Sequence, residues 1–155
     1  MRSQRGYTLV ELSITAAVLV TLLVIAVPNF SSMLRGQQIR NAALDVASTI
    51  TYARSEAVKR NTLVNVTAAT AGWKGGWAVA PASASTIRSH DAFSGIAITE
   101  ANGNTQFQFG GNGRMQQPLN LKFTVAPATS TAHVQSLCIS VGTTGRALTT
   151  TGACS

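Results

Sequence analysis

The sequence is poor in the residues that carry out chemistry. Only 11% of its 155 residues are charged, and it has 5 acidic residues and 2 histidines. His90 and His133 lie far apart, outside any metal-binding spacing, and the acids beyond residue 60 are only Asp91 and Glu100. Catalytic and metal centres need several such side chains together. We therefore predict that the chain is not an enzyme and uses no metal or cofactor.

Cysteine is also scarce, which limits the chain to one internal disulfide bond. Cys138 and Cys154 both lie near the C-terminus. The part of the chain beyond the helix, about 95 residues, can bury only a limited share of its surface and would gain from a covalent link, which an oxidising compartment would allow. The sequence alone leaves two possibilities open, a bridge or two buried free thiols.

Acidic residues are fewer than basic ones, with 12 Lys and Arg against 5 Asp and Glu. The formal net charge is +7, and loss of Arg2 and Arg5 with a short leader would leave +5. An excess of this kind favours an anionic partner, such as nucleic acid or a lipid surface, although many basic domains bind neither.

What the sequence does have is one long apolar run near its N-terminus. Residues 12–34 contain no charge. A helix over 7–27 would rise about 30 Å, one hydrocarbon thickness. Arg2 and Arg5 precede it, so the positive-inside tendency keeps the N-terminus cytoplasmic and sends the rest across the membrane.

Three kinds of segment share this pattern: a cleaved signal peptide, a signal anchor and a pilin-type leader. Glu11 separates them. An acid near the start of a membrane span costs about 2–3 kcal/mol at mid-bilayer and less near an interface, so it needs a partner. A signal peptide gains nothing from such a residue, and Glu11 therefore favours the pilin-type leader.

The run from Gly6 to Leu12, Gly-Tyr-Thr-Leu-Val-Glu-Leu, resembles the prepilin peptidase site of type IV pilins and type II secretion pseudopilins. The resemblance implies cleavage after Gly6 and N-methylation of Tyr7, which stands where Phe or Met is usual. Glu11 is then the fifth residue of the mature chain. Pro28 matches the helix-breaking proline that pilins commonly carry at position twenty-two.

Both filament residues have a physical rationale. The Glu11 carboxylate of one subunit can neutralise the α-amine of its neighbour inside an apolar filament, because a buried charge is tolerated only when paired. Pro28 lacks an N–H and clashes with the preceding turn, so it should kink or locally open the helix. Its alternative role is a stop at the membrane edge.

A second, amphipathic half of the same helix should follow, making one helix over 7–60 with Gly36 as a weak point. Apolar residues recur at three- and four-residue steps on one face: Ile39, Ala42, Ala43, Val46, Ile50, Ala53, Ala57 and Val58. The opposite face carries Gln38, Arg40, Asn41, Asp45, Ser48, Arg54, Glu56 and Lys59. Glu56 can meet Lys59 and Arg60 along the surface.

The rest of the chain should form strands. Alternation is clearest over 119–125 and weaker over 63–67, 76–80, 96–99, 105–109, 137–141 and 146–149. We predict an α+β, pilin-like fold in which the long helix packs on one antiparallel sheet or two small ones.

The head resembles the GspH/FimT family of minor pilins and minor pseudopilins, in four runs of sequence. These are Tyr52–Asn61, Gly72-Trp73 through Val79, Phe109 to Gly113-Arg114, and Gly145-Arg146. The resemblance to the DNA-receptor members implies a Gly-Arg-x-Arg element, of which Gly145-Arg146-Ala147-Leu148 has only the first Arg. The other candidate DNA-binding residues are Lys74, Arg88, Arg114 and Lys122, provided that the fold gathers them with Arg146.

These inferences divide the chain into a leader (1–6), a transmembrane and filament-core helix (7–35) and a periplasmic head (36–155), made of helix 36–60 and a β-rich region 61–155. The expected location is the inner membrane, with extraction into a pilus or pseudopilus. Expected partners are other pilins or pseudopilins, prepilin peptidase, the inner membrane and DNA. Three functions remain: a minor pilin of a type IV pilus, a minor pseudopilin of type II secretion, and a membrane-anchored periplasmic enzyme.

Overall fold

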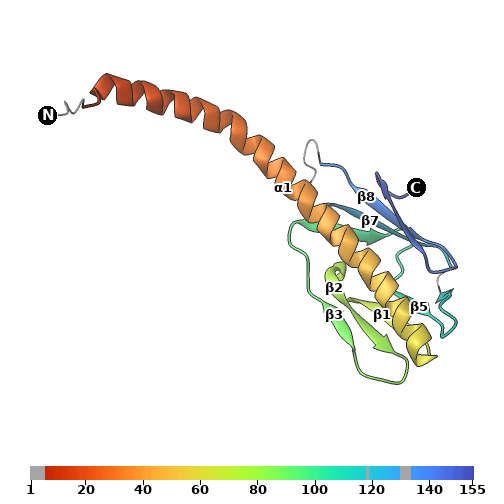
Figure 1. Ribbon diagram of the computed structural model, residues 1–155. Helices are drawn as coiled ribbons and strands as arrows, with labels where there is room; N and C mark the ends of the chain where they lie inside the picture. The colour runs from red at the N-terminus through yellow and green to blue at the C-terminus, as the bar shows by residue number, and fades with distance from the viewer. Residues whose placement is uncertain (1–5, 118, 130–133) are drawn as a thin grey trace.

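The computed structural model describes residues 6–117, 119–129 and 134–155, apart from the side chains of Pro28 and Asn29. Most of the predicted leader and His133 lie outside the described residues. Within the described part of the chain, one long helix is followed by nine strands in two antiparallel sheets (Figure 1). This confirms the predicted fold class and selects the alternative with two sheets.

The helix α1 spans Leu9–Arg60 and has a defined residue at each end. At its start the Thr8 hydroxyl accepts the Glu11 N–H at 3.2 Å, which is a standard N-cap. At its end Asn61 adopts the left-handed conformation, with φ 49°, and donates its N–H back to the last turn. The prediction placed the start at Tyr7, two residues too early, because Thr8 is the capping residue.

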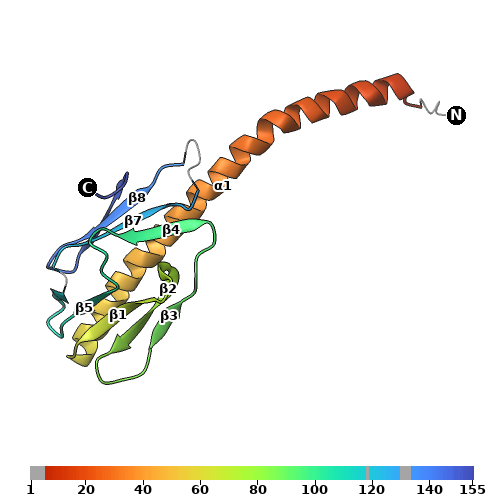
Figure 2. The ribbon, with the colours of Figure 1, turned by 180° about the vertical axis from the view of Figure 1, so that it is seen from behind.

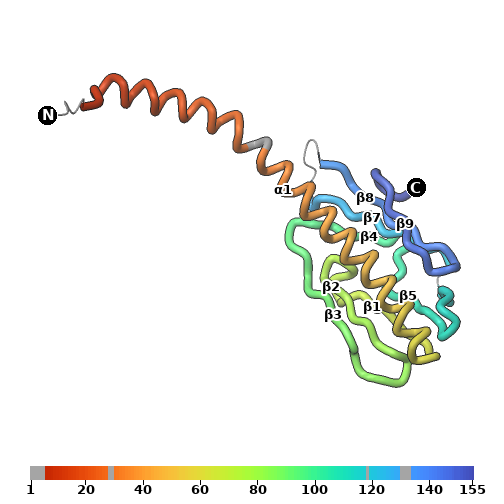
Figure 3. Tube along the Cα trace, viewed as in Figure 1, coloured from red at the N-terminus to blue at the C-terminus, as the bar shows by residue number. Residues whose placement is uncertain are grey.

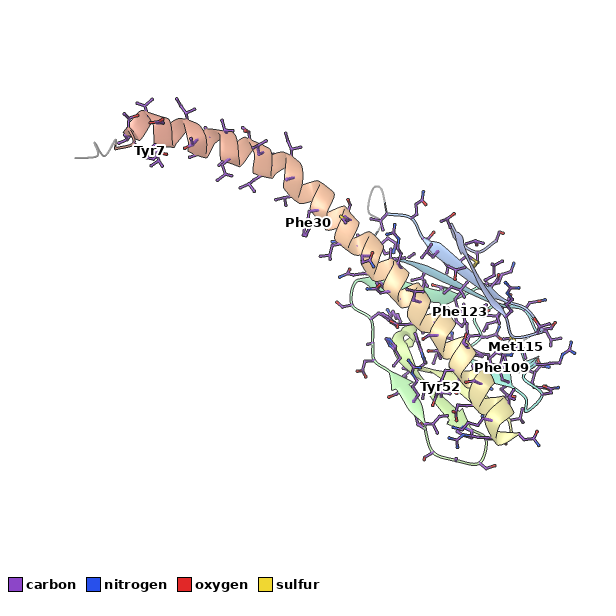
Figure 4. All side chains as sticks on the ribbon, in the orientation of Figure 1. Tyr7, Phe30, Tyr52, Phe109, Met115 and Phe123 are labelled. Carbon is purple, nitrogen blue, oxygen red and sulfur yellow. A yellow bond between two sulfur atoms is a disulfide. The ribbon has the colours of Figure 1, made fainter. Side chains whose placement is uncertain are left out.

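The two halves of α1 have opposite environments. Large apolar residues between Leu9 and Leu34 are exposed, whereas Ile39, Ile50 and Ala57 are almost completely buried. Figure 4 shows the side chains of the first half projecting into open space around the ribbon, with Tyr7 and Phe30 among them. By length and composition this part of α1 could cross a membrane.

Two details of the helix differ from the sequence prediction. Val58 was assigned to the buried stripe, but it is 52% exposed, because the buried face passes through its neighbour Ala57 instead. Glu56 was assigned to the polar surface, yet it is buried, at 8% exposure. The helix is continuous through Gly36, with a gentle curve along its length (Figure 1). The kink or local opening expected at Pro28 stays a prediction.

The first sheet has five strands in the order β3-β2-β1-β5-β6. Its strands are β1 (Val64–Ala69), β2 (Gly72–Pro81), β3 (Arg88–His90), β5 (Gln106–Phe109) and β6 (Met115–Gln117). The second sheet has four strands in the order β4-β7-β8-β9: β4 (Ile96–Glu100), β7 (Leu121–Pro127), β8 (Leu137–Val141) and β9 (Ala147–Thr151). Leu119, predicted to begin the strand now called β7, precedes it and is half exposed.

Both sheets lie on one side of α1, since the helix stands in front of the strands in Figure 1 and behind them in Figure 2. The core lies between the second half of α1 and the two sheets. Phe107, Phe109 and Phe123 are fully buried there. Trp73 packs edge-on against Phe123, with ring centroids 4.8 Å apart. Trp73 and Trp77 are therefore core residues.

The C-terminal tail is fastened to the outer face of the second sheet. Cys138 on β8 forms a disulfide bond with Cys154, which decides between the two alternatives that the sequence left open. The Cys154 N–H also donates to the Thr124 hydroxyl at 3.0 Å. The tail therefore returns across β8 to β7 instead of continuing along β9.

Candidate functional site

The first half of α1 is an apolar surface that nothing in the described chain covers. Tyr7 is 88% exposed and Leu9 is 83% exposed. A Cβ atom placed on Gly6 would have no neighbour within 4 Å. The peptide bond between Gly6 and Tyr7, where cleavage is predicted, therefore lies in an open segment just before the helix begins.

Glu11 is the acidic residue of this surface. Its main-chain N–H is capped by Thr8, and its position in the first turn suits an acid because the helix N-terminus carries partial positive charge. Among the residues that the structure describes, Glu11 forms no ion pair. The predicted partner, the α-amine of a neighbouring subunit, would supply one.

Two of the five candidate DNA-binding residues lie on neighbouring turns. Arg114 follows Gly113 in the β5–β6 turn, and Arg146 follows Gly145 in the β8–β9 turn. The Met115 N–H donates to the Thr143 carbonyl at 3.1 Å, which holds the turns together. Both arginines are exposed.

A third arginine, Arg54 of α1, lies against the same two turns. A Cβ atom on Gly145 would be 3.2 Å from Arg54 Cδ and 3.2 Å from the Gly113 carbonyl oxygen. We call Arg54, Arg114 and Arg146 the arginine cluster. None of its members forms an ion pair with another described residue. Sequence reasoning placed Arg54 only on the polar helix face, since nothing in its spacing links it to either turn.

The other three candidates lie elsewhere. The Lys122 ammonium on β7 donates to the Ser155 main-chain oxygen. Arg88 on β3 stacks over the Tyr52 ring, 5.1 Å from its centroid. Lys74 is exposed on β2, beside β3. The fold thus divides the five residues between its two sheets and does not gather them on one face.

His90 is a packing residue. Its ring stacks on Trp77 and Phe93, with centroids 4.6 Å and 4.5 Å away. Its Nε2 lies 3.3 Å from Asp45 Oδ2 on α1, whereas Asp91 contributes only its main-chain oxygen. The residue therefore joins β3 to the helix.

Glu100 is buried, and its carboxylate organises the turn that follows β4. Oε2 accepts the Asn102 N–H at 2.9 Å and the Asn104 N–H at 2.7 Å. The described residues hold no group of three or more His, Cys, Asp or Glu side chains that could bind a metal ion. Within the described part of the head, His90 and the Oε2 atom of Glu100 thus have structural contacts, whereas Asp91 is exposed.

Comparisons with known proteins agree with this arrangement. A family model described as type II transport protein GspH matches residues 42–145, and the prokaryotic N-terminal methylation motif matches residues 1–27. No relative of this chain is found among curated proteins.

The type IV minor pilin FimU of Pseudomonas aeruginosa PAO1 has a similar fold in two crystal forms. One matches with a TM-score of 0.64 at 24% identity, over 72% of this chain and 87% of FimU. The other matches with a TM-score of 0.62 at 25% identity, over 72% and 91%. The family and fold are those of structural pilins. With the GspH match spanning most of the head and the methylation motif preceding it, the chain belongs to the GspH family of type IV pilin-like proteins.

Proposed function

We propose that this protein is a minor pilin that assembles into, or primes, a type IV pilus. The observation that carries the proposal is the exposed apolar half of α1, which extends from a head whose own core is complete. FimU, which shares the fold, is itself a type IV minor pilin. An apolar surface of this length is stable only in a bilayer or against other helices.

The proposed sequence of events begins with cleavage after Gly6. The new α-amine at Tyr7 and the Glu11 carboxylate then lie on the same exposed end of the chain. Burial of either charged group, the amine or the carboxylate, in the membrane is unfavourable. Pairing between subunits removes part of that cost, so Glu11 favours the filament over the isolated, membrane-inserted chain.

Replacement of Glu11 tests this proposal. Glu11→Ala should leave processing and membrane insertion intact but reduce the protein in sheared filaments about tenfold, since breaking a buried pair is strongly unfavourable. Glu11→Asp is the matched control and should retain part of the assembly, because it keeps the charge. Normal incorporation of Glu11→Ala would refute the role of the carboxylate.

The family's type II transport members provide the alternative, a minor pseudopilin of a secretion system. The GspH match supports it as directly as the FimU fold supports the pilus. Deletion of the gene separates the two. Loss of surface pili with normal protein secretion supports the pilus, and loss of secretion with normal piliation supports the pseudopilus.

DNA capture is a second candidate function, favoured by the arginine cluster. Two of its arginines lie on adjoining turns and the third lies beside them on α1, so the three cations can contact successive phosphates. Each neutralised phosphate should add about −0.9 to the log–log salt slope on duplex DNA. Three contacts imply weak, salt-sensitive binding.

Duplex DNA should therefore be titrated at low salt against the detergent-solubilised full chain. Arg146→Ala should weaken binding, while Arg88→Ala, which removes an equal charge from the other sheet, should not. Equal losses in the two variants would indicate only a general charge effect. No binding at micromolar protein would exclude a receptor role.

A further inference from the structure

β9 forms a free edge of the four-stranded sheet. Among the described residues it pairs with β8 alone, in a regular antiparallel register. Its sequence, Ala-Leu-Thr-Thr-Thr, contains no charge and no proline, and its residues from Leu148 to Thr151 are exposed. Charges, prolines and bulges are the usual features that prevent edge strands from pairing with other chains. β9 has none of these protections.

Hydrogen bonds at both ends of the β8–β9 pair establish which backbone groups face outward. Residues 146 and 152 each form a main-chain hydrogen bond across to the chain of β8. Since bonded and non-bonded positions alternate along an antiparallel pair, even-numbered residues of β9 face β8 and odd-numbered ones face outward. The outward-facing residues are Ala147, Thr149 and Thr151. No main-chain partner for them occurs within the described part of the chain.

The side chains of these three residues lie on the helix side of the sheet. Thr149 stands opposite Ile139, which is fully buried in the core with α1. Thr149 itself is exposed, and β9 is the edge strand of this sheet (Figure 3). Between Thr151 and α1 lies a pocket of about 220 Å³ whose lining includes Gly36 and Arg40.

This pocket continues the surface by which the chain is proposed to assemble. Gly36 and Arg40 directly follow the exposed apolar half of α1, so a subunit packed along that half reaches the pocket and then β9. We propose that β9 receives an extended strand of a neighbouring, non-identical pilin subunit, which adds to the four-stranded sheet and places side chains in the pocket. The inference rests on the proposed function as a filament subunit.

A second copy of this chain fits the edge poorly. Antiparallel pairing of β9 with another β9 requires a two-fold axis that points the two helices in opposite directions, whereas helices anchored in one membrane point the same way. The other edges that a copy could offer are unsuitable. β3 and β6 have three residues each, and β4 packs beside β2. Arg40 and Arg146 flank β9, which favours an uncharged or acidic strand.

Thr149→Pro tests the inference in the full-length protein, expressed in the bacterium that assembles it. Proline removes the outward N–H of residue 149 and leaves every β8–β9 hydrogen bond in place, as edge positions tolerate. We expect about a tenfold loss from sheared filaments, because the ring also obstructs an incoming strand. Thr149→Val, which retains the N–H, should assemble normally. Unchanged assembly of Thr149→Pro, with Glu11→Ala impaired, would overturn this inference and leave the proposed function standing.

Photo-crosslinking identifies the occupant. With benzoylphenylalanine in place of Thr151, the expected adduct is a different protein that carries the N-terminal methylation motif, and Thr149→Pro should abolish it. An adduct with a second copy of this chain, or one that persists in Thr149→Pro, would overturn the proposal. A melting temperature of Thr149→Pro close to that of wild type would confirm that the head remains folded. Thr150→Pro breaks a hydrogen bond to β8 and is the comparison. A melting temperature of Thr149→Pro as low as that of Thr150→Pro would contradict the assignment of the Thr149 N–H to the outer edge.

Discussion

The Trp77 indole N–H donates to the Thr49 hydroxyl at 3.0 Å, and this bond joins the five-stranded sheet to α1. Thr49 is 3% exposed and is one of the few polar residues inside the core. Because water does not reach the pair, the indole has no ready substitute for this acceptor. The bond therefore fixes the rotation of α1 over the sheet as well as contributing to stability.

Thr49→Val should destabilise the head by about 1–3 kcal/mol, because it preserves the side-chain shape but leaves a buried donor unsatisfied. Urea unfolding of the detergent-solubilised protein measures the effect. Thr51→Val is the matched control, since the Thr51 hydroxyl is exposed and bonds only to Ala47 in its own helix. An equal loss of unfolding free energy in the two variants would show that the hydrogen bond from Trp77 to Thr49 does not contribute to stability.

Gly145→Ala should be strongly destabilising because its position combines a left-handed backbone with close neighbours. Its φ is +75°, and an added Cβ would lie 2.7 Å from Phe109 Cε1. A strained backbone of this kind costs about 1–3 kcal/mol. Gly142→Ala, in the same turn, has an unrestricted φ and no neighbour within 4 Å of its Cβ. Thermal melting should separate the two variants, and a melting point for Gly145→Ala as high as that for Gly142→Ala would contradict the contact with Phe109.

The ion pair of Glu56 should make stability depend on pH in the acidic range. Arg60 Nε donates to Glu56 Oε2 at 2.7 Å. This bond, aided by Lys59 and opposed by burial, holds the pKa of Glu56 below its ordinary value of 4.5. A lowered carboxyl pKa gives stability that is fully present above the unfolded value and is lost as the pH falls through the folded one.

Wild type should therefore exceed Glu56→Gln in melting temperature at pH 7, and the difference should shrink as the pH falls below 4.5 toward 3. Asp91→Asn removes an exposed acid without an ion pair among the described residues and provides the control. A difference for Glu56→Gln that stays constant with pH would show that the carboxylate acts through packing alone.

Loss of the disulfide bond should cost roughly 3 kcal/mol on the loop-entropy model, since the bridge joins residues 16 positions apart. The double variant Cys138→Ala, Cys154→Ala removes it without leaving a free thiol. A reductant should lower the melting temperature of wild type toward that of the double variant and leave the double variant unchanged. A reductant effect on the double variant would point to another cause.

Features that depend on local periodicity could be predicted from the sequence. The three- and four-residue spacing from Ile39 to Ala57 corresponds to the buried face of α1, and the alternation of Leu121, Phe123 and Val125 corresponds to the buried face of β7. β3 and β6 were missed because three residues are too short to show a period. Their positions are decided by pairing with β2 and β5, which only the folded chain reveals.

The candidate site was predictable in its N-terminal part and much less so in the head. The family and the methylation motif are confirmed, while the roles of Gly6, Tyr7, Glu11 and Pro28 remain predictions. Arg54 joins Arg114 and Arg146 through turns that are distant in sequence, so no spacing indicates the cluster. Lys122 donates to Ser155 and lies apart from the arginine cluster. This contact depends on the C-terminal tail crossing the sheet.

The placement of α1 also has a mechanical consequence. The same unbroken helix is exposed at one end and forms the core of the head at the other. A filament under tension would pull along the helix axis, parallel to the surface that packs against both sheets. Such a shearing force must displace many apolar contacts at once, whereas a perpendicular force would peel them apart in turn. The head should thus remain folded while the helix of the same subunit is pulled out of the membrane.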